Sequence, residues 1–281
     1  AEISLKDRRM PVEVTLEAFT PMIPLNTDDS SIPCAVLRYR VKNKTDKKAE
    51  LSIAASMLNP VGFTGYDRFE NLTRSFPEGN INEFRRGKGF SGLFLTNTKL
   101  SEKDLKYGNL SVVTTAPKVT YKTHWMHKDW WDGIHDMWDD FTEDGRLEDN
   151  PVVYEENNRL AKIGSMAVSD TLEGGESKDF LFLLTWYFPN RMEGWSQECC
   201  GPRCECKITQ NYYANLFKSS WHVAEYMIEN FDRLYKATSD FHKALFESSL
   251  PPFVVDAIAS NMTVLRSTTC SRLKNGKFFG Y

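Results

Sequence analysis

The sequence has no long apolar run and no excess of charge of one sign, and both absences exclude classes of protein. Its longest apolar stretch, 180–188, has the length of a strand, whereas a membrane-spanning helix needs ~20 residues. The formal net charge is −3 and the isoelectric point is near 6.0, so we expect no basic face and no nucleic-acid partner. Residues 1–6 do not form a signal peptide, so we expect that none exists or that it was removed.

Cysteine is sparse, and the six thiols of the 281-residue chain are too few for a disulfide scaffold. Two of them, Cys34 and Cys270, are isolated among apolar neighbours and are expected to be free and buried. The other four lie in one short segment, at Cys199, Cys200, Cys204 and Cys206. Four thiolates suit zinc, but adjacent cysteines cannot easily both ligate, and no C-x2-C pair is present. Unremarkable thiols are favoured, with a metal site and a labile disulfide as alternatives.

Local signatures of catalysis are also missing. The chain contains no Gly-x-Ser-x-Gly and no His-Glu-x-x-His. One basic cluster, Arg85-Arg86-Gly87-Lys88, stands in a glycine-rich loop. A phosphate cradle needs a helix after the loop, but the next segment has strand character. The residues alone therefore assign no catalytic, cofactor-binding or metal-binding residue, and no cofactor.

What the sequence does contain is the two-residue alternation of strands, over 12–18, 34–41 and 51–57. In the second stretch one face carries Ala35, Leu37, Tyr39 and Val41, and the other carries Cys34, Val36, Arg38 and Arg40. The crossing segment, 19–33, has three prolines, which exclude it from the middle of a sheet. A strand, a long crossing, a strand, a turn at 43–48 and a return strand predict an antiparallel β-sandwich.

Further strands are predicted at 93–95, 110–115, 119–125, 161–168 and 179–188, with a hairpin turn at 173–176. The strand at 179–188 is mostly apolar, as in a strand buried on both faces. Residues 60–92 carry glycine and charge without a sustained period, so we expect a long surface excursion there.

The segment 125–141 is the most aromatic part of the chain. Trp131, His135 and Trp138 recur at helical spacing, which predicts a short amphipathic helix ended near Gly145. The tryptophans Trp125, Trp130, Trp131 and Trp138 could stack on sugar rings, but packing onto the sheet is favoured. A metal could be bound by the neighbouring His124, His127, His135, Asp132, Asp136 and Asp139, although no metal motif is present.

Paired acids are more often solvated or turn residues than catalytic dyads. This applies to the pairs Asp28/Asp29, Asp139/Asp140 and Glu155/Glu156. The first pair is expected to brace the crossing segment. Glycosylation triplets, relevant only in a secreted eukaryotic protein, begin at Asn43, Asn71, Asn109 and Asn261.

After Pro189 the pattern becomes helical. Helices are predicted over 211–230 and 231–246, and a third begins at Pro251-Pro252, where Ser248-Ser249 can cap and proline fits the first turn. Its apolar stripe is Val255, Ile258, Ala259, Met262 and Leu265. Asn275-Gly276 predicts a turn before an extended piece at 277–281. Strands followed by helices indicate a mainly β, then α, arrangement in segregated layers.

Four stretches in one order carry a family resemblance. They are 16–33 with 41–45, 182–191, 211–217 with 223–224, and 248–252 with 256–261 and 265–267. The first, Leu16-Glu17-Ala18-Phe19-Thr20-Pro21 through Asp28-Asp29-Ser30-Ser31-Ile32-Pro33, resembles the amino-terminal domain of the bile-acid β-glucosidase (non-lysosomal glucosylceramidase) family, glycoside hydrolase family 116. The others resemble its last sandwich strand, its linker helix and the entry into its helical domain.

The resemblance implies a large β-sandwich followed by linker helices and the first helix or helices of an (α/α)6 barrel. The domains are then expected at 1–190 (sandwich), 191–249 (cysteine-rich connector and linker helices) and 250–281 (start of the helical catalytic domain). Family members cleave β-glucosides with retention, which requires two carboxyl groups ~5 Å apart. Both belong to the barrel, carboxy-terminal to the matched region, so no residue here is expected to receive a catalytic role.

The expected activity is therefore that of the amino-terminal portion of a retaining β-glucosidase-like hydrolase acting on β-glucosides or glucosylated lipids. Its expected partners are a carbohydrate or glycolipid substrate and the remaining helical barrel. The cysteine quartet departs from the family pattern. The alternative is a stand-alone carbohydrate-binding or structural sandwich without catalytic activity.

Overall fold

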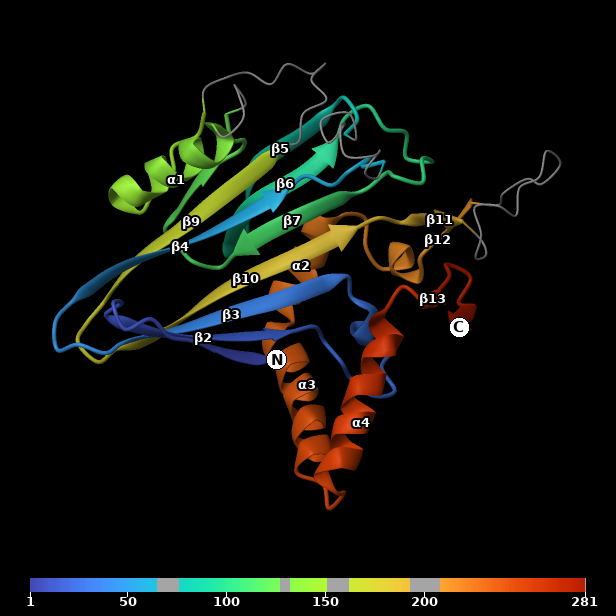
Figure 1. The fold of residues 1–281 in the computed structure, drawn as a ribbon. Coiled ribbons are helices and arrows are strands. Elements are labelled where there is room, and N and C mark those ends of the chain that lie inside the picture. Colours follow the sequence, from blue (N-terminus) through green and yellow to red (C-terminus); the bar gives the residue numbers. More distant parts are fainter. Residues whose placement is uncertain (65–75, 127–131, 151–161, 193–207, 281) are drawn as a thin grey trace.

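The computed structural model describes residues 1–64, 76–126, 132–150, 162–192 and 208–280, and it contains two antiparallel sheets packed face to face (Figure 1). The large sheet has the order β1 (Glu2–Leu5), β2 (Val12–Phe19), β3 (Cys34–Asn43), β10 (Ser177–Tyr187), β7 (Asn109–Thr114), β6 (Phe90–Asn97), β5 (Asn80–Gly87). The small sheet has the order β4 (Ala49–Leu58), β9 (Ile163–Leu172), β8 (Val119–Lys122). The predicted antiparallel β-architecture is confirmed.

The chain passes between the two sheets through two turns that lie side by side. One joins β3 to β4, and the other, at 173–176, joins β9 to β10. The Asn43 side chain is buried between them and donates to the carbonyls of Lys47, Leu172 and Glu173. The prediction of a hairpin at 173–176 was wrong, because the strands on its two sides pair in different sheets. Local turn chemistry does not encode which sheet the next strand joins.

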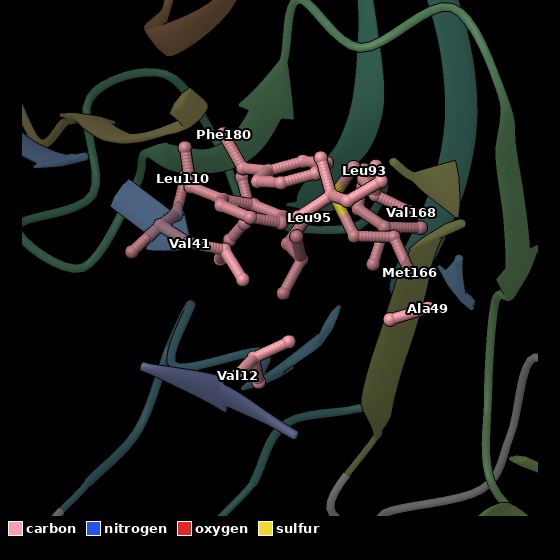
Figure 2. Packing of buried hydrophobic residues seen from close by; sticks show 12 residues of the cluster. Val12, Val41, Ala49, Leu93, Leu95, Leu110, Met166, Val168 and Phe180 are labelled. Atoms are coloured by element: carbon pink, nitrogen blue, oxygen red, sulfur yellow. The ribbon is translucent and has the colours of Figure 1, made fainter. Parts of the chain in front are cut away.

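The core between the sheets is apolar on both sides. Leu93 of β6 and Phe180 of β10 meet Met166 of β9 in one buried cluster (Figure 2). The alternation along β3 divides its side chains as predicted. Val41 packs into this cluster, whereas Val36 belongs to a second cluster on the other face of the large sheet. The large sheet is therefore the middle layer, and it is apolar on both faces over much of its width.

The predicted surface excursion at 60–92 was wrong in part, because β5 lies within it and pairs with β6 along its whole length. Asparagines occupy buried positions at this edge of the sheet, at Asn59, Asn80, Asn82 and Asn97. Their amides are hydrogen-bonded, as from Asn59 Nδ2 to the Ile81 and Thr96 carbonyls. A polar residue at a buried position hides the two-residue period from a search for apolar alternation.

Two other strand boundaries differ from expectation. β8 ends at Lys122 rather than at residue 125, and β9 runs to Leu172, beyond residue 168. Two short antiparallel strand pairs follow, β11 (Asn190–Met192) with β12 (Ile208–Gln210), and β13 (Cys270–Arg272) with β14 (Phe278–Gly280). The turn before β14 contains Gly276 at φ 86°, as the Asn-Gly pair predicts.

Helices cover both outer sides of the sandwich (Figure 1). α1 (Asp132–Asp144) lies on the small sheet, and it is followed by Gly145 at φ 77°, as predicted. α2 (Ser220–Glu229) packs on the opposite side, against β10 and β7. α3 (Phe231–Phe246), as predicted, and α4 (Pro252–Met262) form an antiparallel pair that projects away from the sheets.

One predicted helix is divided in two. Residues 211–230 form a short 3-10 turn, η4 (Tyr212–Asn215), and then α2. Ser219 interrupts them because its hydroxyl accepts the His222 N–H and caps α2. At α4 the first-turn proline is as predicted, but Pro251 stands at the cap and the expected serine cap is not formed. Among the described helices, none is long and apolar enough to span a bilayer.

Candidate functional site

The described tryptophans of the aromatic segment differ, because Trp125 packs onto the sheet whereas Trp138 is largely exposed. The indole Nε1 of Trp125 donates to Ser165 Oγ over 2.7 Å. Ser165 is fully buried on the outer face of the small sheet, where it also bonds Ser56 at 2.6 Å. Trp138 on α1 is 55% exposed. His127, Trp130, Trp131 and the side chain of Asp132 lie outside the described residues.

The acids of α1 bind the helix to the small sheet. Lys122 of β8 is 3% exposed, and its Nζ lies 3.3 Å from Asp136 Oδ1 and 3.2 Å from Asp140 Oδ2. The other oxygen of Asp136 accepts the Met126 N–H at 2.9 Å and Asn150 Nδ2 at 3.0 Å. These two carboxylates therefore neutralise a buried ammonium group.

The two described histidines of the predicted metal set lie in different surroundings. His135 pairs with Asp139 over 3.7 Å on the exposed side of α1. His124 is partly buried, and burial lowers its pKa, although nearby Asp149 acts in the opposite direction. Within the described ranges, no group of three or more histidine, cysteine or acidic residues has a metal-binding arrangement.

The basic cluster lies at the end of β5 and at the start of the turn that leads to β6. Arg85 pairs with Glu83 over 2.6 Å and lies 3.5 Å from the centroid of the Phe94 ring. Because a strand follows the turn, the helix that a phosphate cradle requires is absent at this place, as the sequence indicated.

The isolated cysteines and the glycosylation triplets agree with the sequence predictions only in part. Cys34 is free and buried as predicted, whereas Cys270 is free but only partly buried. The amides of Asn43 and Asn109 are buried, which contradicts any role as glycan acceptors in the folded chain. Asn261 is exposed on α4, and the other candidates lie outside the described residues, namely Asn71, Glu155, Glu156, Cys199, Cys200, Cys204 and Cys206.

The crossing segment is where the carboxy-terminal elements join the sandwich. Asp29, in the short turn η1 (Asp29–Ser31), is buried and lies 2.6 Å from Arg233 of α3. The Tyr226 hydroxyl donates to the same carboxylate at 2.8 Å. Burial raises the pKa of Asp29, but the hydrogen bonds from Arg233, Tyr226 and Asn26 outweigh it, so the pKa lies below its ordinary value.

Two more arginines bind the crossing segment. Arg266, in η5 (Thr263–Arg266), donates to Thr20 Oγ1 at 2.5 Å, to the Ile32 carbonyl at 3.2 Å and to the Ser30 carbonyl. Arg272 of β13 lies 2.7 Å from Asp28. The expected bracing role of the Asp28/Asp29 pair is therefore confirmed, but its arginine partners lie more than 200 positions later in the chain and left no local signal.

A carboxylate pair that the sequence did not indicate lies at the edge of the large sheet. Glu2 and Glu17 are opposite each other on β1 and β2 and line a hollow of about 190 Å³ with Tyr235 and His242. Glu17 accepts hydrogen bonds from Arg38 and from the Tyr235 hydroxyl. Because Arg38 neutralises Glu17, this acid serves as an ion-pair partner rather than as one of two free carboxyl groups.

The α3–α4 pair exposes an apolar surface. Of the predicted stripe on α4, Val255 is 5% exposed, whereas Ile258 is 36% and Leu265 is 54% exposed. We use the name apolar tip for the exposed side chains Phe246, Leu250, Phe253 and Ile258, which lie where α3 ends and along α4. A surface of this kind is typical of a contact with another part of a protein.

Comparison with known proteins shows a matching family model and similar solved structures. The family model described as "beta-glucosidase 2, glycosyl-hydrolase family 116 N-term" matches residues 1–234. A solved structure titled "Putative kojibiose phosphorylase from human microbiome" matches with 10% sequence identity and a TM-score of 0.35. The match covers 84% of this chain and 21% of the other, so the chain spans about a fifth of that protein's length.

Proposed function

The chain belongs to glycosyl-hydrolase family 116, whose N-terminal domain it carries, and on this premise we propose that it is the amino-terminal portion of a retaining β-glucosidase-like enzyme. The substrates are β-glucosides or glucosylated lipids. The two catalytic carboxyl groups come from an (α/α)6 barrel of the longer protein, to which residues 250–281 contribute the first helix. The sandwich, 1–190, and the connector, 191–249, support that barrel.

The apolar tip is the observation that carries this proposal. Phe253 is 76% exposed at the start of α4, and Asp256 is the only charged residue of that helix. Each Å² of apolar surface left in water costs ~25 cal/mol, so another surface that covers this face stabilises the protein. A helical barrel that continues from α4 supplies that surface.

The arginine contacts at the crossing segment support the role of the sandwich as a platform. Arg233, Arg266 and Arg272 come from α3, η5 and β13, and all three bind residues 20–32. These contacts fix the direction in which the chain leaves the sandwich. A fixed exit direction is what a domain needs if it is to position its neighbour.

The proposal is tested by comparing residues 1–281 with the longer protein from the same gene on an aryl β-glucoside. We expect turnover only by the longer protein, with the β-anomer released first, as observed by NMR. Turnover by residues 1–281, or release of the α-anomer, would overturn the proposal.

The stand-alone binding module is the competing function, and Trp138 is the observation in its favour, because an indole that is 55% exposed is free to stack on a sugar. Glucan affinity of residues 1–281 that is lost in Trp130→Ala, Trp131→Ala or Trp138→Ala would favour it. The uncovered apolar tip counts against independence of the chain.

A further inference from the structure

A hollow of about 630 Å³ lies between the crossing segment, the end of β10 and the β13–β14 hairpin. Its volume falls in the range of small-molecule sites, roughly 300–1,000 Å³. Residues from 30–33, 186–191, 211–213 and 265–278 line it, so it is built by segments that are distant in the sequence. The hollow is not lined by any of the described tryptophan, histidine or aspartate residues of the aromatic segment.

The hollow is positively charged. Arg191, Arg266 and Arg272 line it, and none of the described lining residues is acidic. The local sequence is also one-sided, because residues 257–281 contain four lysines and arginines and no aspartate or glutamate. A site with cations and no carboxylates of its own attracts an anionic group.

The three arginines differ in whether a nearby carboxylate neutralises their charge. Arg272 is neutralised by Asp28 and lies 3.4 Å from the centroid of the Tyr212 ring. Arg266 donates only to neutral oxygens, those of Thr20, Ser30 and Ile32. Its charge therefore acts on the hollow without a counter-ion among the described residues.

Arg191 has unused donor capacity. Its Nε is buried and has no hydrogen-bond partner within the described part of the chain. A buried donor left without an acceptor costs about 1–3 kcal/mol, and an acceptor that reaches the guanidinium recovers part of this. A carboxylate, sulfate or phosphate is the best acceptor for a guanidinium, because its oxygens match the planar donor geometry.

The hollow also offers an apolar face. Phe278 of β14 lines it and is 59% exposed. The other aromatic side chains that line the hollow, Trp186, Phe188, Tyr212 and Tyr213, are each partly buried, so Phe278 offers the most exposed ring. Serine and threonine hydroxyls, at Ser267, Thr268 and Ser271, complete the wall with groups that can bond to sugar hydroxyls.

We propose that this hollow binds a sugar that carries an anionic group, with Arg191 bonding the anion, Arg266 supplying a second positive charge and Phe278 packing on the ring. The choice of a sugar as the ring rests on the proposed function, whereas the anionic group rests on the arginines alone.

Residues 1–281 are titrated at low salt with methyl β-D-glucuronide, glucose 6-phosphate, methyl β-D-glucoside and inorganic phosphate, and binding is followed by calorimetry. We expect at least one acidic sugar to bind about tenfold more tightly than the neutral glucoside, because only the acidic ligand pairs an anion with the guanidinium. The two acidic ligands distinguish a carboxylate from a phosphate as the preferred anion.

The variants locate the site. Arg191→Gln and Phe278→Ser should each weaken the acidic sugar about fivefold or more, whereas Arg9→Gln, at an exposed arginine paired with Asp7, should leave its affinity unchanged. Circular dichroism confirms that each variant is folded.

The proposal is overturned by equal affinity for the neutral glucoside, by phosphate binding as tightly as the acidic sugars, or by an unchanged affinity in Arg191→Gln. A longer protein that hydrolyses aryl β-glucosides while residues 1–281 bind no acidic sugar would overturn this inference and leave the proposed function standing.

Discussion

Arg233 of α3 and Asp29 of the crossing segment lie 204 positions apart in the sequence and 2.6 Å apart in space. The arginine is about half exposed, whereas the carboxylate is buried and also accepts a hydrogen bond from Tyr226. This ion pair joins the first strands of the chain to its helices. A substitution at Asp29 therefore tests how strongly the helices are attached to the sandwich.

Replacing Asp29 with asparagine should lower the free energy of unfolding by about 1–2 kcal/mol at neutral pH. The change removes the charge from a buried hydrogen-bonded site, and the exposure of Arg233 reduces the effect below that of a fully buried pair. Urea titration followed by tryptophan fluorescence measures it. Lys236→Gln breaks an exposed pair with Asp240 on the same helix and should change stability by less than about 0.5 kcal/mol.

The same pair predicts a pH dependence. Because the pKa of Asp29 is lowered in the folded protein, its stabilisation is present above the ordinary value of 3.8 and is lost as pH falls through the folded pKa. The difference in stability between the wild type and Asp29→Asn should shrink in this acid range. A difference that stays constant down to the acid end of the titration would show that ionisation of Asp29 does not contribute.

Lys122 is the residue that attaches α1 to the small sheet. Lys122→Met should cost about 2–4 kcal/mol, because Asp136 and Asp140 would be left close together without their cation. Hydrogen exchange should become faster across 132–144 while β10 stays protected. His135→Gln, at the exposed pair with Asp139, is the matched control and should leave exchange unchanged. Uniformly faster exchange in both sheets would contradict a local attachment.

Cys34 should resist alkylation in the folded protein. It is 1% exposed, and burial raises the pKa of its thiol to about 12, so almost no thiolate is present at pH 8. Cys270 is partly exposed and should react with iodoacetamide first, as peptide mass spectrometry can show. Both should react in urea. Equal native rates for the two thiols would mean that the contact of Cys34 with Met227 opens readily.

The sequence alone predicted the elements in which apolar residues occupy the buried positions at a regular spacing. The two faces of β3 and the bounds of α3 were predicted because apolar residues occupy the buried positions. β5 was missed because Asn80 and Asn82 occupy its buried positions. The sheet-to-sheet turn at 173–176 was missed because a turn sequence specifies local geometry and not the pairing partner of the next strand.

The candidate sites likewise combine features that the sequence predicts with contacts that only the folded chain shows. The role of Asp29 as a brace followed from its place in a proline-rich segment, but the identity of Arg233 as its partner depends on tertiary packing. The arginines around the hollow are spread over 191–272, with no motif that links them. Long-range ion pairs of this kind have no spacing rule, so the structure is needed to find them.

The apolar tip should make residues 1–281 self-associate as concentration rises. Phe253 and Leu250 are 76% and 45% exposed, and pairing of two tips removes both from water. Sedimentation velocity should show dimers or larger species that disappear in the Leu250→Ser, Phe253→Ser double variant, with no loss of stability. Leu25→Ser is the matched control, because Leu25 is fully exposed but lies on the crossing segment, away from the tip. In the longer protein the same double variant should instead lower the free energy of unfolding, because we propose that a barrel covers the tip there. A monomeric wild type at all concentrations, or an unchanged longer protein, would contradict this account of the surface.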